Sequence, residues 1–173
     1  MATLDQNNIW AQGHIDPDWG LQHRDLDYIH EQFNDRESLA EWRQLGYTQS
    51  KFTGDMYDMR FPEPAWMSSI CDKFCWTKLG WSVYRMSPGA VLPAHRDTYR
   101  RFKLIHGLES TQSVVRTIVF LEDWSSGHYL EMNGVPVINW RAGDWVSWRD
   151  DFLHLAANVG KTDRYTLQLT GTT

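Results

Sequence analysis

The stretch Trp81-Ser-Val-Tyr-Arg-Met-Ser-Pro-Gly-Ala-Val-Leu-Pro-Ala-His-Arg-Asp97 decides the fold of this chain. On either side of its Ser-Pro-Gly turn the period of the sequence is two, which predicts strands over Trp81 to Met86 and Val91 to Asp97. Side chains in a strand repeat every two residues, so His95 and Asp97 are expected on one face. A strand, a turn and a strand that ends in a possible ligand pair therefore begin the second half of the chain.

The same period of two continues toward the carboxyl end. The Asn133-Gly134 dipeptide is a strong hairpin signal, and Arg141 to Asp144 reads as another turn. About eight strands in about 90 residues predict a mainly β double-stranded β-helix, that is, a cupin-like jelly roll. The further strands are predicted at Phe102 to His106, Val114 to Leu121, Tyr129 to Leu130, Val135 to Trp140, Trp145 to Trp148, and in two last segments that contain His154 and Arg164.

Residues 25–80 show helical spacing instead. Apolar residues recur at three and four, which predicts helices that buttress the sheet. We expect a single domain over 1–173, with a helical support region at 1–80 and the jelly-roll core at 81–173; residues 1–24 read as an ordered arm or outer strand. The helical sets are Leu26, Ile29 and Phe33; Leu39, Trp42 and Leu45, ending at Gly46; and, after Pro62 and Pro64, Trp66, Ile70 and Phe74, ending at Gly80.

Composition limits the class of protein. The chain has 173 residues and a net charge of -5, which argues against nucleic-acid binding by bulk charge. It has no apolar run of membrane-spanning length and its first residues lack signal-peptide features, so a soluble protein in the cytoplasm is expected. Most of the ten tryptophans should be core, and Cys71 and Cys75 are expected as reduced thiols. The sequence gives no indication of oligomeric state.

Three residues have the pattern of a metal site. His95 and Asp97, with His154 from another strand, are two imidazoles and one carboxylate, the set associated with mononuclear Fe(II) enzymes that activate O₂. Arg164 follows ten residues after His154 and shares a strand face with Thr166. Its planar guanidinium suits the distal carboxylate of 2-oxoglutarate.

Two blocks of sequence carry a family resemblance. His95-Arg-Asp-Thr-Tyr-Arg-Arg-Phe-Lys-Leu-Ile-His106-Gly-Leu has a second histidine eleven residues after the first, and Asp150-Asp-Phe-Leu-His154-Leu-Ala-Ala-Asn158-Val-Gly-Lys-Thr-Asp-Arg164 has an Asp-Asp pair, a histidine, an asparagine and an arginine. The chain from His95 to Thr170 resembles the 2-oxoglutarate- and Fe(II)-dependent oxygenases and is most similar to the aspartyl/asparaginyl β-hydroxylase family.

The resemblance implies an enzyme that uses Fe(II), O₂ and 2-oxoglutarate to hydroxylate an amino acid, free or within a peptide or protein, with Asp, Asn or Pro favoured. The implied metal ligands are His95, Asp97 and His154. Arg164 would hold the outer carboxylate of the co-substrate with Thr166 and Tyr84, while His106 would support the inner carboxylate or orient the substrate. For Tyr84, Thr166 and His106 an ordinary strand role is an equal alternative. Asn158 and Asp150 would support the site from behind.

Two departures from the family are visible. Relatives have glycine where this chain has Asp97, and they tend to place an arginine where it has Leu104, beside Lys103. The carboxylate favours hydroxylation over halogenation, and the missing arginine leaves the inner carboxylate without an assigned partner. Several basic residues lie near the metal motif, and they could either recognise an anionic group of the substrate or form a solvated face of the protein. These residues are Arg96, Arg100, Arg101, Lys103 and Arg116.

Two other classes of protein stay open. A cupin-type enzyme could use the same ligands with another metal and no 2-oxoglutarate. A tryptophan-rich jelly roll could instead bind carbohydrate through aromatic stacking, with an accidental ligand set.

Overall fold

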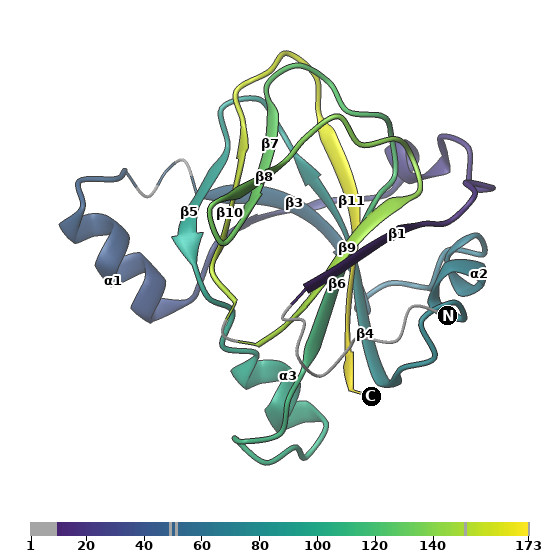
Figure 1. The fold of residues 1–173 in the computed structure, drawn as a ribbon, viewed down its shortest axis with the longest axis horizontal. Helices are drawn as coiled ribbons and strands as arrows, with labels where there is room; N and C mark the ends of the chain where they lie inside the picture. Colours follow the sequence, from purple (N-terminus) through teal and green to yellow (C-terminus); the bar gives the residue numbers. More distant parts are fainter. Residues whose placement is uncertain (1–9, 49, 51, 151, 173) are drawn as a thin grey trace.

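A computed structural model describes residues 10–48, 50, 52–150 and 152–172 as two antiparallel sheets that face each other (Figure 1). This is the predicted mainly β, double-stranded β-helix fold. The larger sheet has the order β1-β9-β6-β11-β4-β3-β2 and the smaller has the order β5-β10-β7-β8. The strands are β1 Trp10–His14, β2 Ile29–Gln32, β3 Thr53–Asp58, β4 Thr77–Met86, β5 Val91–His95, β6 Val115–Phe120, β7 His128–Met132, β8 Val135–Val137, β9 Asp144–Arg149, β10 His154–Asn158 and β11 Arg164–Thr172.

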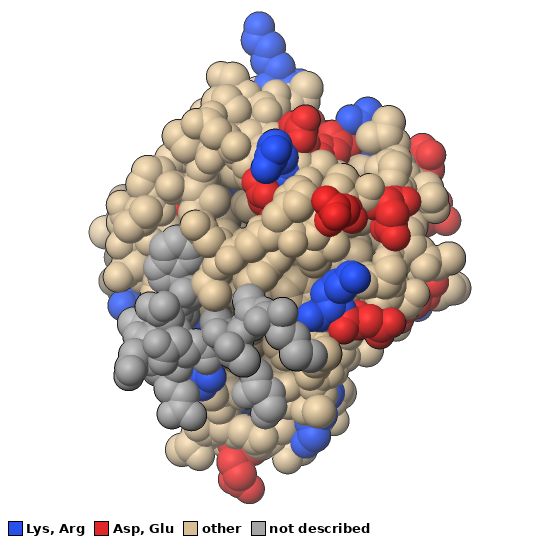
Figure 2. All heavy atoms as spheres, turned by 45° about the vertical axis from the view of Figure 1, so that its right-hand side comes forward, with Lys and Arg blue, Asp and Glu red and all other residues tan. Residues whose placement is uncertain are grey.

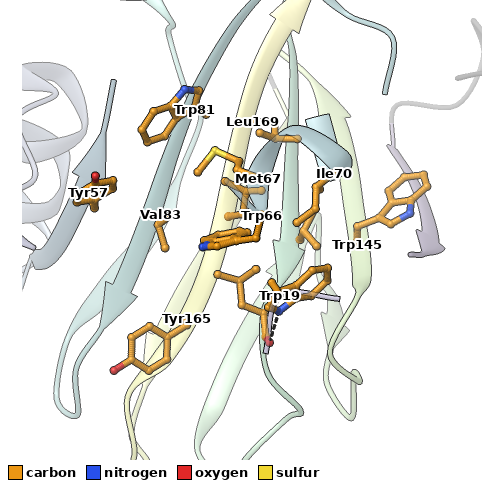
Figure 3. Packing of buried hydrophobic residues seen from close by; sticks show 13 residues of the cluster. Trp19, Tyr57, Trp66, Met67, Ile70, Trp81, Val83, Trp145, Tyr165 and Leu169 are labelled. Atoms are coloured by element: carbon orange, nitrogen blue, oxygen red, sulfur yellow. Dashed lines mark hydrogen bonds between the residues drawn. The ribbon is translucent and has the colours of Figure 1, made fainter. Parts of the chain in front are cut away.

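The larger sheet is buried on both faces, because its strands carry apolar side chains at odd and even positions. On β4, Trp81 and Val83 belong to an outer cluster, while Tyr84 and Met86 belong to an inner cluster between the sheets. The outer face is covered by the N-terminal segment and by helix α2 (Met67–Cys71), whose side chains lie over the strands in Figure 3. The inner face is therefore left to line the space between the sheets.

The tryptophans are mostly core, as predicted. Seven are buried, and Trp76 and Trp124 are half-buried. Within the part of the chain whose burial the structure describes, no tryptophan presents the exposed platform on which a sugar would stack. The buried ones are Trp19, Trp42, Trp66, Trp81, Trp140, Trp145 and Trp148.

The N-terminal segment is fixed to the outer face through Glu122, which follows β6. His23 Nε2 donates to Glu122 Oε1 (2.7 Å), and Arg24 bonds both carboxylate oxygens at 2.6 and 2.7 Å. Burial alone would raise the pKa of Glu122, but the bonds from His23 and Arg24 outweigh it and lower that pKa to about 2. This contact attaches the N-terminal segment to the larger sheet, far from the space between the sheets, and it should weaken when Glu122 is protonated.

The predicted helix that ends at Gly46 is confirmed as α1, Arg36–Gln44. Asp35 caps it by accepting from the Ser38 amide (2.9 Å), and Gly46 has the positive φ of 88° typical of a glycine after a helix. Trp42 packs from this helix against Phe52, and its indole Nε1 donates to the carbonyl of Ala94 on β5 (3.1 Å). The helix thus covers the edge strand of the smaller sheet (Figure 1).

Other helix predictions were wrong in part. The segment around Ile29 is strand β2, because hydrogen bonding to β3, which the sequence did not reveal, overrides its three-and-four spacing. Helix α2 ends at Cys71 and a positive φ at Cys75 (51°) turns the chain into β4, so Gly80 lies in a strand instead of ending a helix. The strand predicted at Phe102 to His106 is helix α3, Arg100–Ile105.

The strands after α3 agree with the prediction, except that β8 ends at Val137 and not at Trp140. Asn133 and Gly134 both have positive φ (50° and 83°), as a tight hairpin turn requires, and they join β7 to β8. Eight strands, β4 to β11, follow residue 76 in the described residues. Within those residues no helix is long and apolar enough to cross a bilayer. On the face seen in Figure 2, acidic and basic side chains lie interspersed.

Candidate active site

His95 and His154 lie directly opposite each other on neighbouring strands of the smaller sheet. His95 is the last residue of β5 and His154 the first of β10, and the two are paired across the ladder. Asp97 reaches them from the loop after β5. The strand predicted as far as Asp97 ends two residues earlier, so the turn of this loop, and not strand alternation, brings the carboxylate to the histidines.

Backbone carbonyls fix both imidazoles in the same tautomer. Nδ1 of His95 donates to the carbonyl of Pro93 (2.7 Å), and Nδ1 of His154 donates to the carbonyl of Phe152 (3.0 Å). Because each Nδ1 carries the hydrogen, each Nε2 is left with its lone pair. These Nε2 atoms lie 3.9 and 3.8 Å from the carboxylate oxygens of Asp97, too far for a hydrogen bond.

The protonation states also suit a cation. Burial lowers the pKa of His154 to about 4, which keeps the imidazole neutral. Burial alone would raise the pKa of Asp97, but its surroundings, the Arg116 guanidinium foremost, outweigh that effect, and the pKa is lowered. Possible ligand atoms of the three residues all lie within 4.8 Å of one another. Two imidazoles and one carboxylate around such a gap fit Fe(II) or a similar divalent ion.

Aromatic rings hold His95 in place. Trp42 and Phe33 meet its ring edge-on, with centroids 5.4 and 5.2 Å away, and Trp148 lies 4.9 Å from the ring of His154. The sequence marked Trp42 and Phe33 only as apolar helix positions. Their contact with the histidine depends on how α1 folds back on β5, and no local pattern shows this.

A cavity of about 340 Å³ opens beside the three residues. Its walls come from both sheets and from the β2–α1 segment, and they include the triad together with Tyr84, Arg116, Arg164 and Gln168.

Arg164 lies at one end of this cavity and is only 4 % exposed. Its Nη1 donates to the carbonyl of Tyr129 (2.8 Å), while its buried Nε has no acceptor, and neither does the buried hydroxyl of Thr166 two residues later. Burial lowers the pKa of Arg164 to about 10 and raises that of Tyr84 to about 12. A buried cation with unused donors beside two hydroxyl groups is suited to a carboxylate from a bound molecule, such as the outer carboxylate of 2-oxoglutarate.

Other residues singled out from the sequence lie elsewhere. His106 caps α3 against the ring of Phe102 (centroids 4.4 Å apart) and is not among the cavity-lining residues. Asn158 is buried, and its amide bonds the carbonyls of Met86 (2.6 Å) and Thr162 (2.9 Å), so it ties loops together.

The basic residues near the metal motif separate into different environments. Arg100 pairs with Glu37 on the surface, and Lys103 pairs with Asp150 (2.9 Å). Leu104 is 82 % exposed, so the position where the aspartyl/asparaginyl β-hydroxylases tend to have an arginine points to solvent in this chain. Arg101 and Arg116, however, line the cavity.

Comparisons with known proteins agree with this fold and go no further than the fold. No protein-family model matches the chain and no curated protein sequence does, so the resemblance to the aspartyl/asparaginyl β-hydroxylases has no support from them. A prolyl-4-hydroxylase from Pseudomonas putida is similar in structure, with a TM-score of 0.55 at 14% identity over 84% of this chain and 91% of that one.

Two further solved structures are similar. A viral collagen prolyl hydroxylase from Paramecium bursaria Chlorella virus-1, solved as a 2-oxoglutarate complex, gives a TM-score of 0.53 at 14% identity over 87% of this chain and 98% of that one. A predicted oxalate decarboxylase from Thermotoga maritima gives 0.44 at 15% identity over 70% and 82%. The chain thus shares its fold, a double-stranded β-helix of two antiparallel sheets, with the two prolyl hydroxylases.

Proposed function

We propose that this protein is a 2-oxoglutarate- and Fe(II)-dependent dioxygenase that hydroxylates an amino acid, free or within a peptide. The observation that carries the proposal is a His-Asp-His set at one cavity whose wall also contains a buried arginine with an unused donor. The two structurally similar prolyl hydroxylases support the same reaction class. We further propose that residues 1–173 form one domain, in which the first 80 residues support the core.

Each residue has a role that follows from its surroundings. His95, His154 and Asp97 would hold Fe(II), and three protein ligands leave positions for co-substrate and O₂. Arg164 would anchor the outer carboxylate of 2-oxoglutarate, with the Tyr84 and Thr166 hydroxyl groups beside it. When bound, the metal and co-substrate supply oxidation of an unactivated C–H bond, with succinate and CO₂ as co-products. The protein binds, orients and keeps water away.

A direct test is the decarboxylation of 2-oxoglutarate by the protein loaded with Fe(II) under anaerobic conditions and then exposed to air. We expect succinate to form in the wild type, to form faster with a substrate, and to be absent after treatment with a chelator. A protein that binds Fe(II) tightly but neither binds nor consumes 2-oxoglutarate would contradict the proposal and favour a cupin-type enzyme without this co-substrate.

A further inference from the structure

Arg116, on β6, lies in the candidate active site, but the proposed chemistry assigns no role to its positive charge. Its Nη1 donates to Gln168 Oε1 (3.0 Å), its guanidinium lies over the ring of Tyr99 (5.3 Å to the centroid), and its buried Nε has no acceptor. Asp97 Oδ2 is 3.7 Å from Nη2, which is longer than a hydrogen bond. A guanidinium has five N–H donors, so Arg116 keeps donors available for a ligand.

The register of the larger sheet places Arg116 far from the Arg164 end of the cavity. On β11, Arg164 is six residues before Thr170, and Thr170 is the ladder partner of Arg116. At about 3.3 Å per residue, the backbones of the two arginines are about 20 Å apart along the strand. Between them lie the Tyr84–Thr166 pair and then Gln168. Arg164 and Arg116 therefore serve different parts of the cavity.

Gln168 completes the polar surface at the Arg116 end. It lines the cavity, and since its oxygen accepts from Arg116, its amide NH₂ stays a donor. Two adjacent donor groups, one of them charged, match the two oxygens of a carboxylate.

Nearby acidic side chains are already paired with another cation. Glu31 and Asp58 line the same cavity, but both bind Arg60, at 2.5 and 2.8 Å. Asp97 faces the two histidines as well as Arg116, and a carboxylate that ligates a metal shares its charge with that metal. The ion pair between Arg116 and Asp97 would weaken when Asp97 ligates the metal, which leaves positive charge on Arg116 for a ligand.

We infer that Arg116 and Gln168 form a carboxylate-binding subsite for the substrate, so that the molecule to be hydroxylated presents a free carboxylate beside the metal centre. This inference rests on the proposed function and narrows its substrate class to acids: free amino acids, acidic side chains or peptide C-termini. The sequence suggested that several basic residues recognise an anionic substrate group, and this inference assigns that recognition to Arg116, one of the two that line the cavity.

The test compares matched pairs of compounds that differ only in carboxylate or carboxamide, such as L-proline with L-prolinamide and free with amidated peptides. Succinate formed above the substrate-free background is measured for the Fe(II)-loaded wild type and for Gln168→Glu, Arg116→Gln and Arg100→Gln. Gln168→Glu is nearly isosteric, keeps the charge of Arg116 and gives it a permanent carboxylate partner, so it tests the subsite even if Arg116→Gln folds poorly. The dissociation constant of 2-oxoglutarate is measured separately by anaerobic calorimetry.

We expect the wild type to prefer the acid of a pair by about tenfold or more in kcat/KM, the factor typical of losing one charge-assisted hydrogen bond. Gln168→Glu and Arg116→Gln should abolish most of that preference by raising KM for the acid, while the exposed control Arg100→Gln should keep it. A residue that only oriented Asp97 would lower metal affinity without changing the preference.

Three outcomes would overturn the inference. In the first, 2-oxoglutarate is consumed normally but acids and amides stimulate turnover equally, and the proposed function survives alone. In the second, Gln168→Glu weakens 2-oxoglutarate binding and leaves the preference unchanged, which would assign the subsite to the co-substrate. In the third, the wild type does not bind 2-oxoglutarate, and the inference falls together with the proposed function.

Discussion

Replacing Arg164 with methionine tests the co-substrate end of the cavity. The guanidinium is buried, uses Nη1 on the Tyr129 carbonyl and leaves Nε without an acceptor, so two donors are available to a carboxylate. Two charge-assisted bonds at about 1.5–3 kcal/mol each amount to about 3–6 kcal/mol in 2-oxoglutarate binding. The hydroxyl groups of Tyr84 and Thr166 remain and recover part of this. We therefore expect affinity to fall by about 10- to 1000-fold.

The same variant should hardly lose stability. Burial lowers the pKa of Arg164 from its ordinary value to about 10, which corresponds to about 3 kcal/mol against the buried charge in the ligand-free protein. Methionine removes this cost but leaves the Tyr129 carbonyl unpaired, which costs about 1–3 kcal/mol. The two effects nearly cancel, so the free energy of unfolding of the ligand-free Arg164→Met protein should lie within about 2 kcal/mol of the wild-type value.

Anaerobic calorimetry and thermal unfolding with Fe(II) and 2-oxoglutarate measure both effects. At 2-oxoglutarate concentrations about 100 times the wild-type dissociation constant, binding should stabilise the wild type by about 2.7 kcal/mol, and a variant weakened about 100-fold by only about 0.4 kcal/mol. Arg141→Met, on an exposed turn, is the matched control. A folded Arg164→Met protein with an unchanged dissociation constant would refute the assignment of this arginine.

Three further predictions concern the metal, acid stability and the cavity wall. His154→Ala should abolish Fe(II) binding and turnover because it removes one of three ligands, whereas Asp97→Gly should weaken metal binding less. Equilibrium dialysis with Fe(II) measures both effects, and full Fe(II) binding by His154→Ala would exclude the proposed triad. The lowered pKa of Glu122 stabilises the folded state above about pH 4.5, and this contribution of about 1–3 kcal/mol should disappear as pH falls toward 2; Glu122→Gln should remove that pH dependence in urea titrations. A methyl group on Gly54 would lie 1.9 Å from the Tyr84 ring, so Gly54→Ala should cost about 1–3 kcal/mol of stability and weaken 2-oxoglutarate binding, and an unaltered crystal position of that ring would contradict the reasoning.

Local patterns were sufficient for much of the fold after residue 76. Alternation defined β4 and β6, and Asn133-Gly134 defined a hairpin because both residues adopt positive φ at little cost. The spacing of His95, Asp97 and His154 also indicated which side chains would meet. For the strands and the hairpin the information lies in a few neighbouring residues, whereas Asp97 reaches the histidines through the loop after β5, which the period of a strand did not show.

Where the prediction failed, a distant partner decided the structure. Ile29–Gln32 is a strand because it extends the sheet beside β3, and Arg100–Ile105 is a helix whose apolar Leu104 and Ile105 face solvent. Short apolar spacing is compatible with either state, and long-range pairing decides between them.

The roles of the basic residues near the site likewise depend on distant contacts that the local sequence does not reveal. Arg100 meets Glu37 from α1, Lys103 meets Asp150 from the end of β9, and Arg116 meets Gln168 from β11. In the sequence all three are simply positive charges. Only the group that each one contacts in the fold shows whether it forms a surface ion pair or is a donor that lines the cavity. An exposed pair contributes about 0–1 kcal/mol and is screened by salt, whereas a partly buried guanidinium beside an amide can select a carboxylate. Removing the charge of Arg100 and of Arg116 should for this reason give different results in the same assay.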